Sequence, residues 1–199
     1  VDYAQIYETK FSVLRAAYKR FRKSTPEYKK FVKDNSAWLE DYALYMAVKK
    51  NNDMKAWTEW EDEDIKLRKP EAIAKYTKEL KPEIDFWKFV QYIFYKRWAE
   101  FRAYVNSLGI KIMGDMPIYV AMDSSDTWAN SDVFWLDEEK QPVCVAGCPP
   151  DAFSPTGQLW GNPLYRWDVH RNTGFEWWMK RLAHCFNMYD VCLLYTSPS

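Results

Sequence analysis

The residues best suited to chemistry lie between positions 115 and 167, where aromatic rings and carboxylates are interspersed with Gly, Pro and Ser. The chain holds 11 Trp, and the flat apolar face of an indole ring suits the C–H face of a sugar ring. Such rings more often fill a hydrophobic core, and composition alone favours that use. Two uses therefore stay open for them: a carbohydrate-binding surface or core packing.

Metal-binding and nucleophile motifs are incomplete in this sequence. Cys144 and Cys148 are close in the chain, but neither His170 nor His184 lies at a spacing that completes a zinc set. There is no Gly-x-Ser-x-Gly elbow, P-loop or dinucleotide fingerprint. We therefore expect structural thiols, no metal site and no cofactor.

The overall charge gives no reason to expect a nucleic-acid or membrane partner. Lys and Arg number 28 and Asp and Glu number 28, and the pI is near 6.9. No apolar run approaches the ~20 residues of a membrane span. The cysteines are scattered through a chain too large to need disulfides, which favours reduced thiols and a cytoplasmic location. Because the first residue is Val1, we expect that the true start is absent.

Apolar residues recur at helical spacing through the first hundred residues. Pro26, Pro70 and Pro82 each mark a helix start, because proline at the first helical position lacks only an amide that has no partner there. The last of these helices is long and should end at Gly109. The sequence therefore predicts a helical region over residues 1–108.

The pattern changes after Gly109. Residues 110–113 predict a short strand, residues 121–166 have little periodic signal, a helix resumes near Gly174, and residues 189–191 resemble the opening of another strand. This alternation is typical of a β/α barrel, in which the loops after the strands build the active site. Asp115 and the long loop should then lie on the catalytic face.

Three sequence blocks in this half carry a specific resemblance. Residues 111–120 read KIMGDMPIYV and are followed by DSSDTWAN, residues 145–154 read VAGCPPDAFS, and residues 156–165 read TGQLWGNPLY. In this order they resemble the 4-α-glucanotransferases, the amylomaltase or disproportionating-enzyme family (glycoside hydrolase family 77). The motif WLEDYAL at 38–44 resembles the family's helical insertion, and the resemblance covers about residues 1–191.

The resemblance implies an α/β fold that forms part of a (β/α)8 TIM barrel with a helical insertion subdomain. Residues 1–108 would be the insertion and the helix leading into the barrel. Residues 109–191 would be part of the catalytic barrel, with an active-site lid loop at about 121–166. The implied activity transfers segments of α-1,4-glucans, such as maltooligosaccharides, glycogen or starch, to the 4-hydroxyl of an acceptor sugar with retention of configuration.

The resemblance also implies five substrate-binding residues. Asp115 would bond a sugar hydroxyl or support the catalytic carboxylates, although a turn or helix cap is the simpler alternative. Asp151 and Phe153 would be sugar contacts on a mobile lid, residues 147–158. Trp160 would stack on a sugar and Asn162 would hydrogen-bond to it, with core packing as the alternative for Trp160.

The chain departs from the family after residue 191. There the family continues into a strand that holds the nucleophilic Asp, whereas residues 192–199 read CLLYTSPS. We interpret these residues as a non-native tail, translated from a DNA-library adapter, and the underlying nucleotides test this. On this interpretation the nucleophile and the acid/base Glu lie beyond the chain, which has no catalytic residue and should be inactive alone.

Two rival functions stay open. An α-glucan hydrolase of related barrel fold would pass the sugar to water. A helical interaction module would use the basic run at residues 10–33 to bind an anionic partner in a salt-dependent way. That run faces away from the apolar stripe, which favours a solvated helix face.

Overall fold

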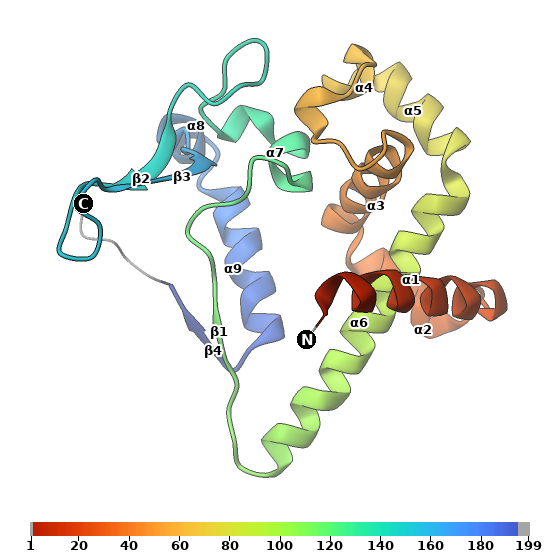
Figure 1. Cartoon of the computed structure of the whole chain (residues 1–199). Helices are drawn as coiled ribbons and strands as arrows, with labels where there is room; N and C mark the ends of the chain where they lie inside the picture. Colours follow the sequence, from red (N-terminus) through yellow and green to blue (C-terminus); the bar gives the residue numbers. More distant parts are fainter. Residues whose placement is uncertain (1, 195–199) are drawn as a thin grey trace. The chain divides into compact units, whose positions relative to one another are not determined.

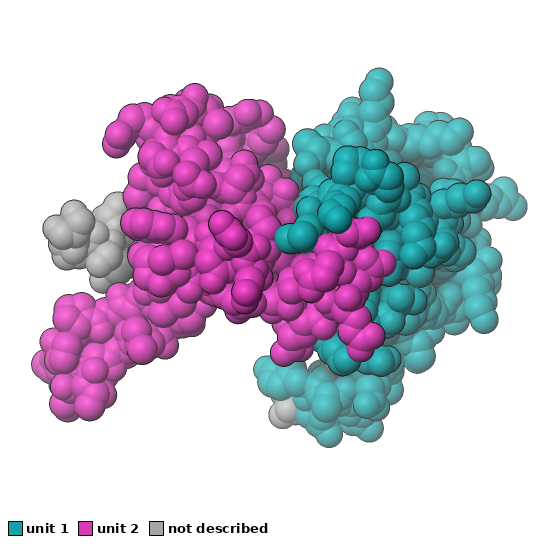
Figure 2. All heavy atoms as spheres, turned by 90° about the horizontal axis from the view of Figure 1, so that it is seen from above, with its two compact units in different colours: residues 1–55, 67–97 teal, residues 56–66, 98–199 magenta. Residues whose placement is uncertain are grey.

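The computed structural model describes residues 2–194, and the chain divides into two compact units (Figure 2). One unit comprises residues 1–55 and 67–97, and the other comprises residues 56–66 and 98–199. The long helix α6 is shared between them, because the division falls inside it, between Arg97 and Trp98.

The first unit is built from helices (Figure 1). They are α1 (Tyr3–Arg20), α2 (Pro26–Asp34), α3 (Ser36–Asn51), α5 (Pro70–Glu79) and the first part of α6 (Lys81–Ser107). The helix starts predicted at Pro26 and Pro70 are confirmed, and α6 begins one residue before Pro82. The predicted end of α6 is confirmed too, since Gly109 follows it with φ +76°.

Aromatic and aliphatic side chains hold the helices of the first unit together. Leu39 and Phe86 are fully buried, and the Phe21 ring lies 4.8 Å from the Phe89 ring. Glu83 on α6 pairs with Arg15 and, at 3.1 Å, with Lys50. Partial burial alone would raise the pKa of Glu83, but the hydrogen bonds from these two cations lower it. The carboxylate therefore links α6 to α1 and α3.

The second unit mixes short helices and strands. Its elements are η1 (Trp57–Glu59), α4 (Glu63–Lys66), the end of α6, β1 (Met113–Asp115), α7 (Ser125–Ala129), η2 (Ser131–Val133), β2 (Val145–Cys148), β3 (Gln158–Pro163), α8 (Trp167–Asn172), α9 (Glu176–Met188) and β4 (Val191–Leu193). The fold is thus mixed α/β, as the alternation of patterns predicts.

The strands of the second unit form two small sheets (Figure 1). Strand β1 pairs in parallel with β4, with Met113 opposite Val191 and Asp115 opposite Leu193. Strands β2 and β3 form an antiparallel hairpin. The strand predicted at residues 110–113 was placed too early, because pairing with the distant β4 decides where β1 begins. A strand does follow α9 as predicted, but β4 begins at Val191, the last of the predicted opening residues 189–191, so this prediction was early as well.

Tryptophans form much of the core of the second unit. Trp57, Trp60 and Trp128 are buried, so core packing is the correct interpretation for these rings. The Trp57 indole N–H donates to the Met122 carbonyl at 2.7 Å, and the Trp128 indole N–H donates to the Ile65 carbonyl at 3.2 Å. These bonds tie residues 56–66 to the long segment 121–166, which is more regular than its sequence predicts.

The proposed non-native tail, residues 192–199, lies partly outside the described residues, which end at Leu194. Cys192 and Leu193 belong to β4. Among the helices of the described chain, none is both long enough and apolar enough to span a bilayer.

Candidate substrate-binding site

The β2–β3 hairpin carries four of the five predicted binding residues (Figure 1). Asp151 and Phe153 lie in the turn at its tip, and Trp160 and Asn162 lie on β3. The fifth, Asp115, is the last residue of β1 in the other sheet. The lid predicted at residues 147–158 is therefore most of a hairpin, with a short ladder beneath its tip.

Asp151 organises the tip of the hairpin. Its Oδ1 accepts hydrogen bonds from the backbone N–H of Phe153 at 2.9 Å and of Ser154 at 2.7 Å. The Ser154 hydroxyl in turn donates to the Gly157 carbonyl at 2.8 Å. Such a local turn, fixed by a carboxylate, leaves the intervening side chains pointing outward. Phe153 accordingly has 95% of its surface exposed.

Two glycines allow the hairpin strands to approach. A Cβ at Gly147 would lie 2.3 Å from the Gln158 carbonyl oxygen, and one at Gly157 would lie 2.6 Å from the Cys148 carbonyl oxygen. Gly157 also has φ +73°, in the left-handed region that favours glycine. The glycines of the motif at 147–157 thus have a steric reason.

Trp160 and Asn162 connect the hairpin to the segment that follows β1. The Trp160 indole N–H donates to Gln158 Oε1 at 3.0 Å, and its ring centroid lies 6.2 Å from that of Tyr119. The Asn162 side-chain amide donates to the Val120 carbonyl at 2.8 Å. Trp160 remains 47% exposed, so the ring is not simply part of the core.

The same segment, residues 116–120, is fixed from α9 and from the end of the hairpin. The Tyr165 hydroxyl donates to the Ile118 carbonyl at 2.7 Å, and Arg181 Nη2 donates to the Pro117 carbonyl at 2.5 Å. The Arg181 guanidinium also lies 5.3 Å from the ring centroid of Trp177, within cation–π range. Side chains therefore hold the carbonyls of residues 117, 118 and 120, just beyond Asp115.

Asp115 has an exposed side chain at the carboxyl end of β1. The next helix, α7, takes its cap from Ser124, whose hydroxyl accepts from the Thr127 N–H. Asp115 is therefore not the cap of that helix. The structure brings Trp160 and Asn162 to the segment that follows Asp115, whereas the hydrogen bonds of Asp151 and the Phe153 backbone stay within the tip.

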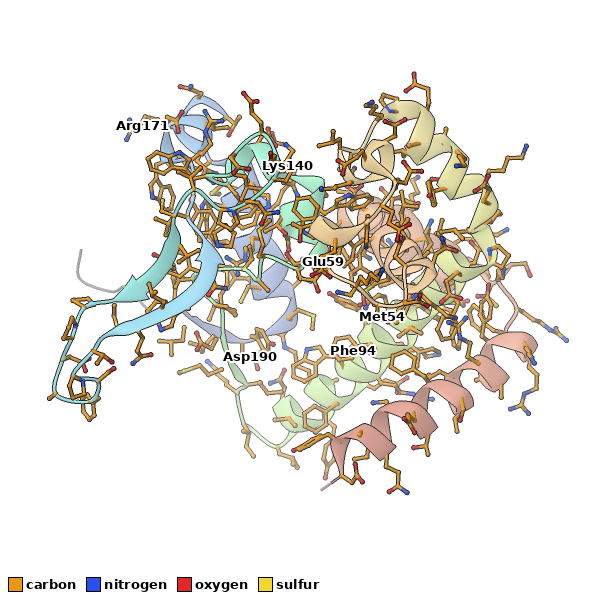
Figure 3. The ribbon with its side chains drawn as sticks, turned by 45° about the horizontal axis from the view of Figure 1, so that its top comes forward. Met54, Glu59, Phe94, Lys140, Arg171 and Asp190 are labelled. Carbon is orange, nitrogen blue, oxygen red and sulfur yellow. The ribbon has the colours of Figure 1, made fainter. Side chains whose placement is uncertain are left out.

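Sequence reasoning missed the role of Asp190, which lies where α9 gives way to β4 (Figure 3). Its carboxylate accepts from the Ile112 N–H at 2.8 Å, from Asn106 Nδ2 at 2.8 Å and from Arg102 Nη2 at 2.6 Å. These bonds, led by that from Ile112, lower the pKa of Asp190 to about 2. The carboxylate sets β4 beside β1 and so positions the strand that ends in Asp115.

Within the described residues, no group of three or more His, Cys, Asp and Glu side chains could hold a metal ion. The four cysteines are free thiols. The chemistry available on the hairpin is therefore aromatic stacking and hydrogen bonding, which are the contacts that an uncharged, hydroxyl-rich ligand can use.

Comparison with known proteins identifies a family that matches this chain. A family model described as 4-alpha-glucanotransferase matches residues 1–194. The 4-alpha-glucanotransferase of Clostridium butyricum is 48% identical over 193 residues, covering 96% of this chain and 39% of the relative. That of Aquifex aeolicus (strain VF5) is 45% identical over 192 residues, again covering 96% of this chain and 39% of the relative.

Solved structures agree with the sequence relatives. The amylomaltase from Streptococcus agalactiae in complex with acarbose superposes with a TM-score of 0.92 at 41% identity, covering 98% of this chain and 40% of that one. The amylomaltase from Corynebacterium glutamicum shares the fold, with a TM-score of 0.74 at 18% identity over 96% of this chain and 24% of that one. The chain spans about 39% of the length of its curated relatives. It belongs to the 4-alpha-glucanotransferase family.

Proposed function

We propose that the complete protein, of which this chain is a part, transfers segments of α-1,4-glucans to the 4-hydroxyl of an acceptor sugar. Membership of the family supports this activity. Maltooligosaccharides, glycogen and starch are the glucans we expect it to use. This chain would supply substrate contacts to that reaction, through Asp115, Asp151, Phe153, Trp160 and Asn162.

The observation that carries the proposal is the exposed aromatic surface of an ordered hairpin. Phe153 is 95% exposed on a turn that Asp151 holds in place, and Trp160 is about half exposed on β3. Exposed rings cost free energy in water and gain it when they stack on the apolar face of a sugar. Hydroxyls of the same sugar can bond to carboxylate and amide groups nearby.

Asn162 and Asp151 would act in part through other groups. The Asn162 amide already donates to the Val120 carbonyl, so its side-chain oxygen is the atom that we assign to a sugar hydroxyl. Asp151 accepts two backbone amides and would serve the glucan mainly by presenting Phe153. Phe153, Trp160 and Asp115 would contact the glucan directly, with no second role in the hairpin assigned to them.

The proposed mechanism is a retaining double displacement. A carboxylate nucleophile and a carboxylic acid/base about 5–5.5 Å apart would form and resolve a covalent glycosyl intermediate. We assign neither group to this chain. The hairpin would act as a lid that excludes water, so that an acceptor sugar reaches the intermediate first.

We propose that residues 109–191 form part of a (β/α)8 barrel and residues 1–108 a helical insertion with the helix leading into it. The parallel pair β1–β4, joined through α7, α8 and α9, supports this, because parallel neighbours of this kind are the repeating unit of such barrels. The cysteines are scattered through a chain too large to need disulfides, which favours a reducing compartment, and we propose the cytoplasm.

The test of the activity uses the complete protein with maltotriose as the sole substrate. A glucanotransferase yields longer maltooligosaccharides together with short sugars, and these are separated by chromatography. The rival α-glucan hydrolase yields only shorter sugars, with one new reducing end for each bond broken. Products confined to that second pattern would exclude the transferase and leave the hydrolase.

A further inference from the structure

A hollow of about 450 Å³ on the first unit is surrounded by lysine side chains. Lys23 follows α1, Lys29 and Lys33 lie on α2, and Lys81 and Lys88 lie on the first turns of α6. A volume of this order suits a small organic ligand. The chain as a whole has no net charge, so this concentration of positive charge is local.

Two carboxylates in the hollow compensate only part of this charge. Lys23 and Lys81 both pair with Asp85, at 2.8 and 3.4 Å, and Lys88 pairs with Glu40 at 2.5 Å. Five ammonium groups against two carboxylates leave an excess of three positive charges. The ion pairs also hold three of the ammonium groups in defined positions around the rim.

Lys29 and Lys33 supply two of the three uncompensated charges, and the third arises because Lys23 and Lys81 share Asp85. Lys29 and Lys33 are one helical turn apart on α2, and both line the hollow. Across the described part of the chain, neither has a carboxylate within ion-pair distance. Like charges at this spacing destabilise a helix slightly, and a bound anion would relieve that repulsion.

The start of α3 adds to the positive potential. Ser36 is the first residue of this 16-residue helix and lines the hollow, and the first turn of α3 contains no acidic residue. The unpaired amides of a first helical turn carry partial positive charge, which favours an anion there. Partial burial alone would lower the pKa of Lys23, but its hydrogen bond to Asp85 raises it to about 12, so this rim lysine stays charged.

We infer that this hollow binds a small phosphate-bearing anion, held by Lys29 and Lys33 with Ser36 and the start of α3 beside them. Lysine ammonium groups are point charges that bind phosphate oxygens well. A concave site focuses the potential on a compact anion, whereas a nucleic acid would need an extended basic stripe. The inference goes beyond the proposed function and does not depend on it.

The test is calorimetric titration of the 199-residue chain at low ionic strength with inorganic phosphate, with glucose 6-phosphate and with neutral maltose. We expect saturable binding of the phosphate probes, weakened by about tenfold or more in the double variant K29E/K33E. The matched control K75E/K78E reverses two lysines on α5 and should change affinity by less than about twofold. The neutralising variant K29Q/K33Q should bind the phosphate probes with an affinity between those of K29E/K33E and the original chain. Circular dichroism should show that the helix content of these variants is unchanged.

The outcomes distinguish a site for free phosphate from a site for a phosphorylated sugar. Equal affinity for both phosphate probes assigns the site to the phosphate group alone, and tighter binding of glucose 6-phosphate assigns it to a phosphorylated sugar. Absence of saturable binding to either probe would overturn the inference. Equal weakening of binding in the α5 control, or equal affinity for neutral maltose, would overturn it as well.

Discussion

At the scale of single residues, Phe153 offers the most direct test of the proposed glucan contacts. Its ring is 95% exposed, so Phe153→Ala should leave the free energy of unfolding within about 0.5 kcal/mol of its original value. Loss of one stacking contact worth about 1 kcal/mol should weaken maltoheptaose binding about fivefold. Titration of the chain, monitored by tryptophan fluorescence or calorimetry, measures the affinity.

The matched control is Leu159→Ala on the same hairpin, where an 85% exposed aliphatic side chain is removed without loss of a ring. It should bind maltoheptaose about as well as the original chain. Equal affinity losses in the two variants would show that the hairpin surface, rather than the aromatic ring, contacts the glucan.

Asp190 gives a prediction about pH. Its pKa is about 2 in the folded chain, against about 3.9 for an unperturbed Asp. A lowered pKa means that the carboxylate contributes stability above about pH 4, and that this contribution disappears as the pH falls towards 2. Asp190→Asn should therefore be less stable than the original chain at pH 6, and the difference should shrink towards pH 2.

Urea unfolding of both proteins across this pH range measures that difference, and subtracting the two curves removes the other carboxylates that titrate there. A stability difference that is constant between pH 6 and pH 2 would contradict the role given to the Asp190 charge. Sequence alone could not have found this role, because the partners Arg102 and Asn106 are 88 and 84 residues away.

At the scale of elements, two glycines of the hairpin form a matched pair. Both have positive φ, +73° at Gly157 and +77° at Gly161, but only at Gly157 would a Cβ meet backbone, 2.6 Å from the Cys148 carbonyl oxygen. Gly161→Ala should lower the free energy of unfolding by about 1–2 kcal/mol, because alanine disfavours the left-handed conformation. Gly157→Ala should lower it by clearly more, because the added Cβ also forces the hairpin tip to move.

Chemical denaturation of the two variants gives the comparison. Similar decreases in the free energy of unfolding would mean that the tip adjusts freely and that Gly157 is required only for its backbone conformation. A larger loss at Gly161 would contradict the close approach of β2 and the tip.

The helices were largely predictable from sequence, whereas the strands were not. Proline at the first helical turn and glycine after the last are local signals, and they place the starts of α2 and α5 and the end of α6 correctly. The start of β1 depends on pairing with β4, far along the chain, so its predicted position was early. The hairpin has a long tip without a tight-turn signal, and its ladder cannot be derived locally.

The five candidate binding residues were predicted from the family motifs rather than from spacing. The motifs do not show which of these side chains are already engaged in bonds within the protein. The Asn162 amide is already bonded to the Val120 carbonyl, and the Asp151 carboxylate is bonded within the tip. Both facts depend on the folded path of the backbone, which a motif does not describe.

At the scale of the whole molecule, the central question is why an acceptor sugar would outcompete water. The proposed answer is a hairpin lid whose tip is kept in shape by Asp151, through bonds to the N–H groups of Phe153 and Ser154. Removing the carboxylate leaves the tip turn without those bonds, each worth about 1 kcal/mol, and should admit water to the site.

In the complete protein, Asp151→Ala should therefore raise the ratio of hydrolysis to transfer with maltotriose by about fivefold, the effect of roughly 1 kcal/mol. The chain provides a control of the same kind in Asp137, whose Oδ1 accepts the Glu139 N–H at 3.0 Å and the Gln141 N–H at 2.8 Å in a different loop. Asp137 lies within residues 121–166 but outside the hairpin that we propose as the lid. Asp137→Ala therefore loosens a turn of the same design without changing the lid, and the product ratio should not change. If both variants shift the ratio equally, general loosening rather than the lid governs access of water; if neither does, water is excluded by some other part of the protein.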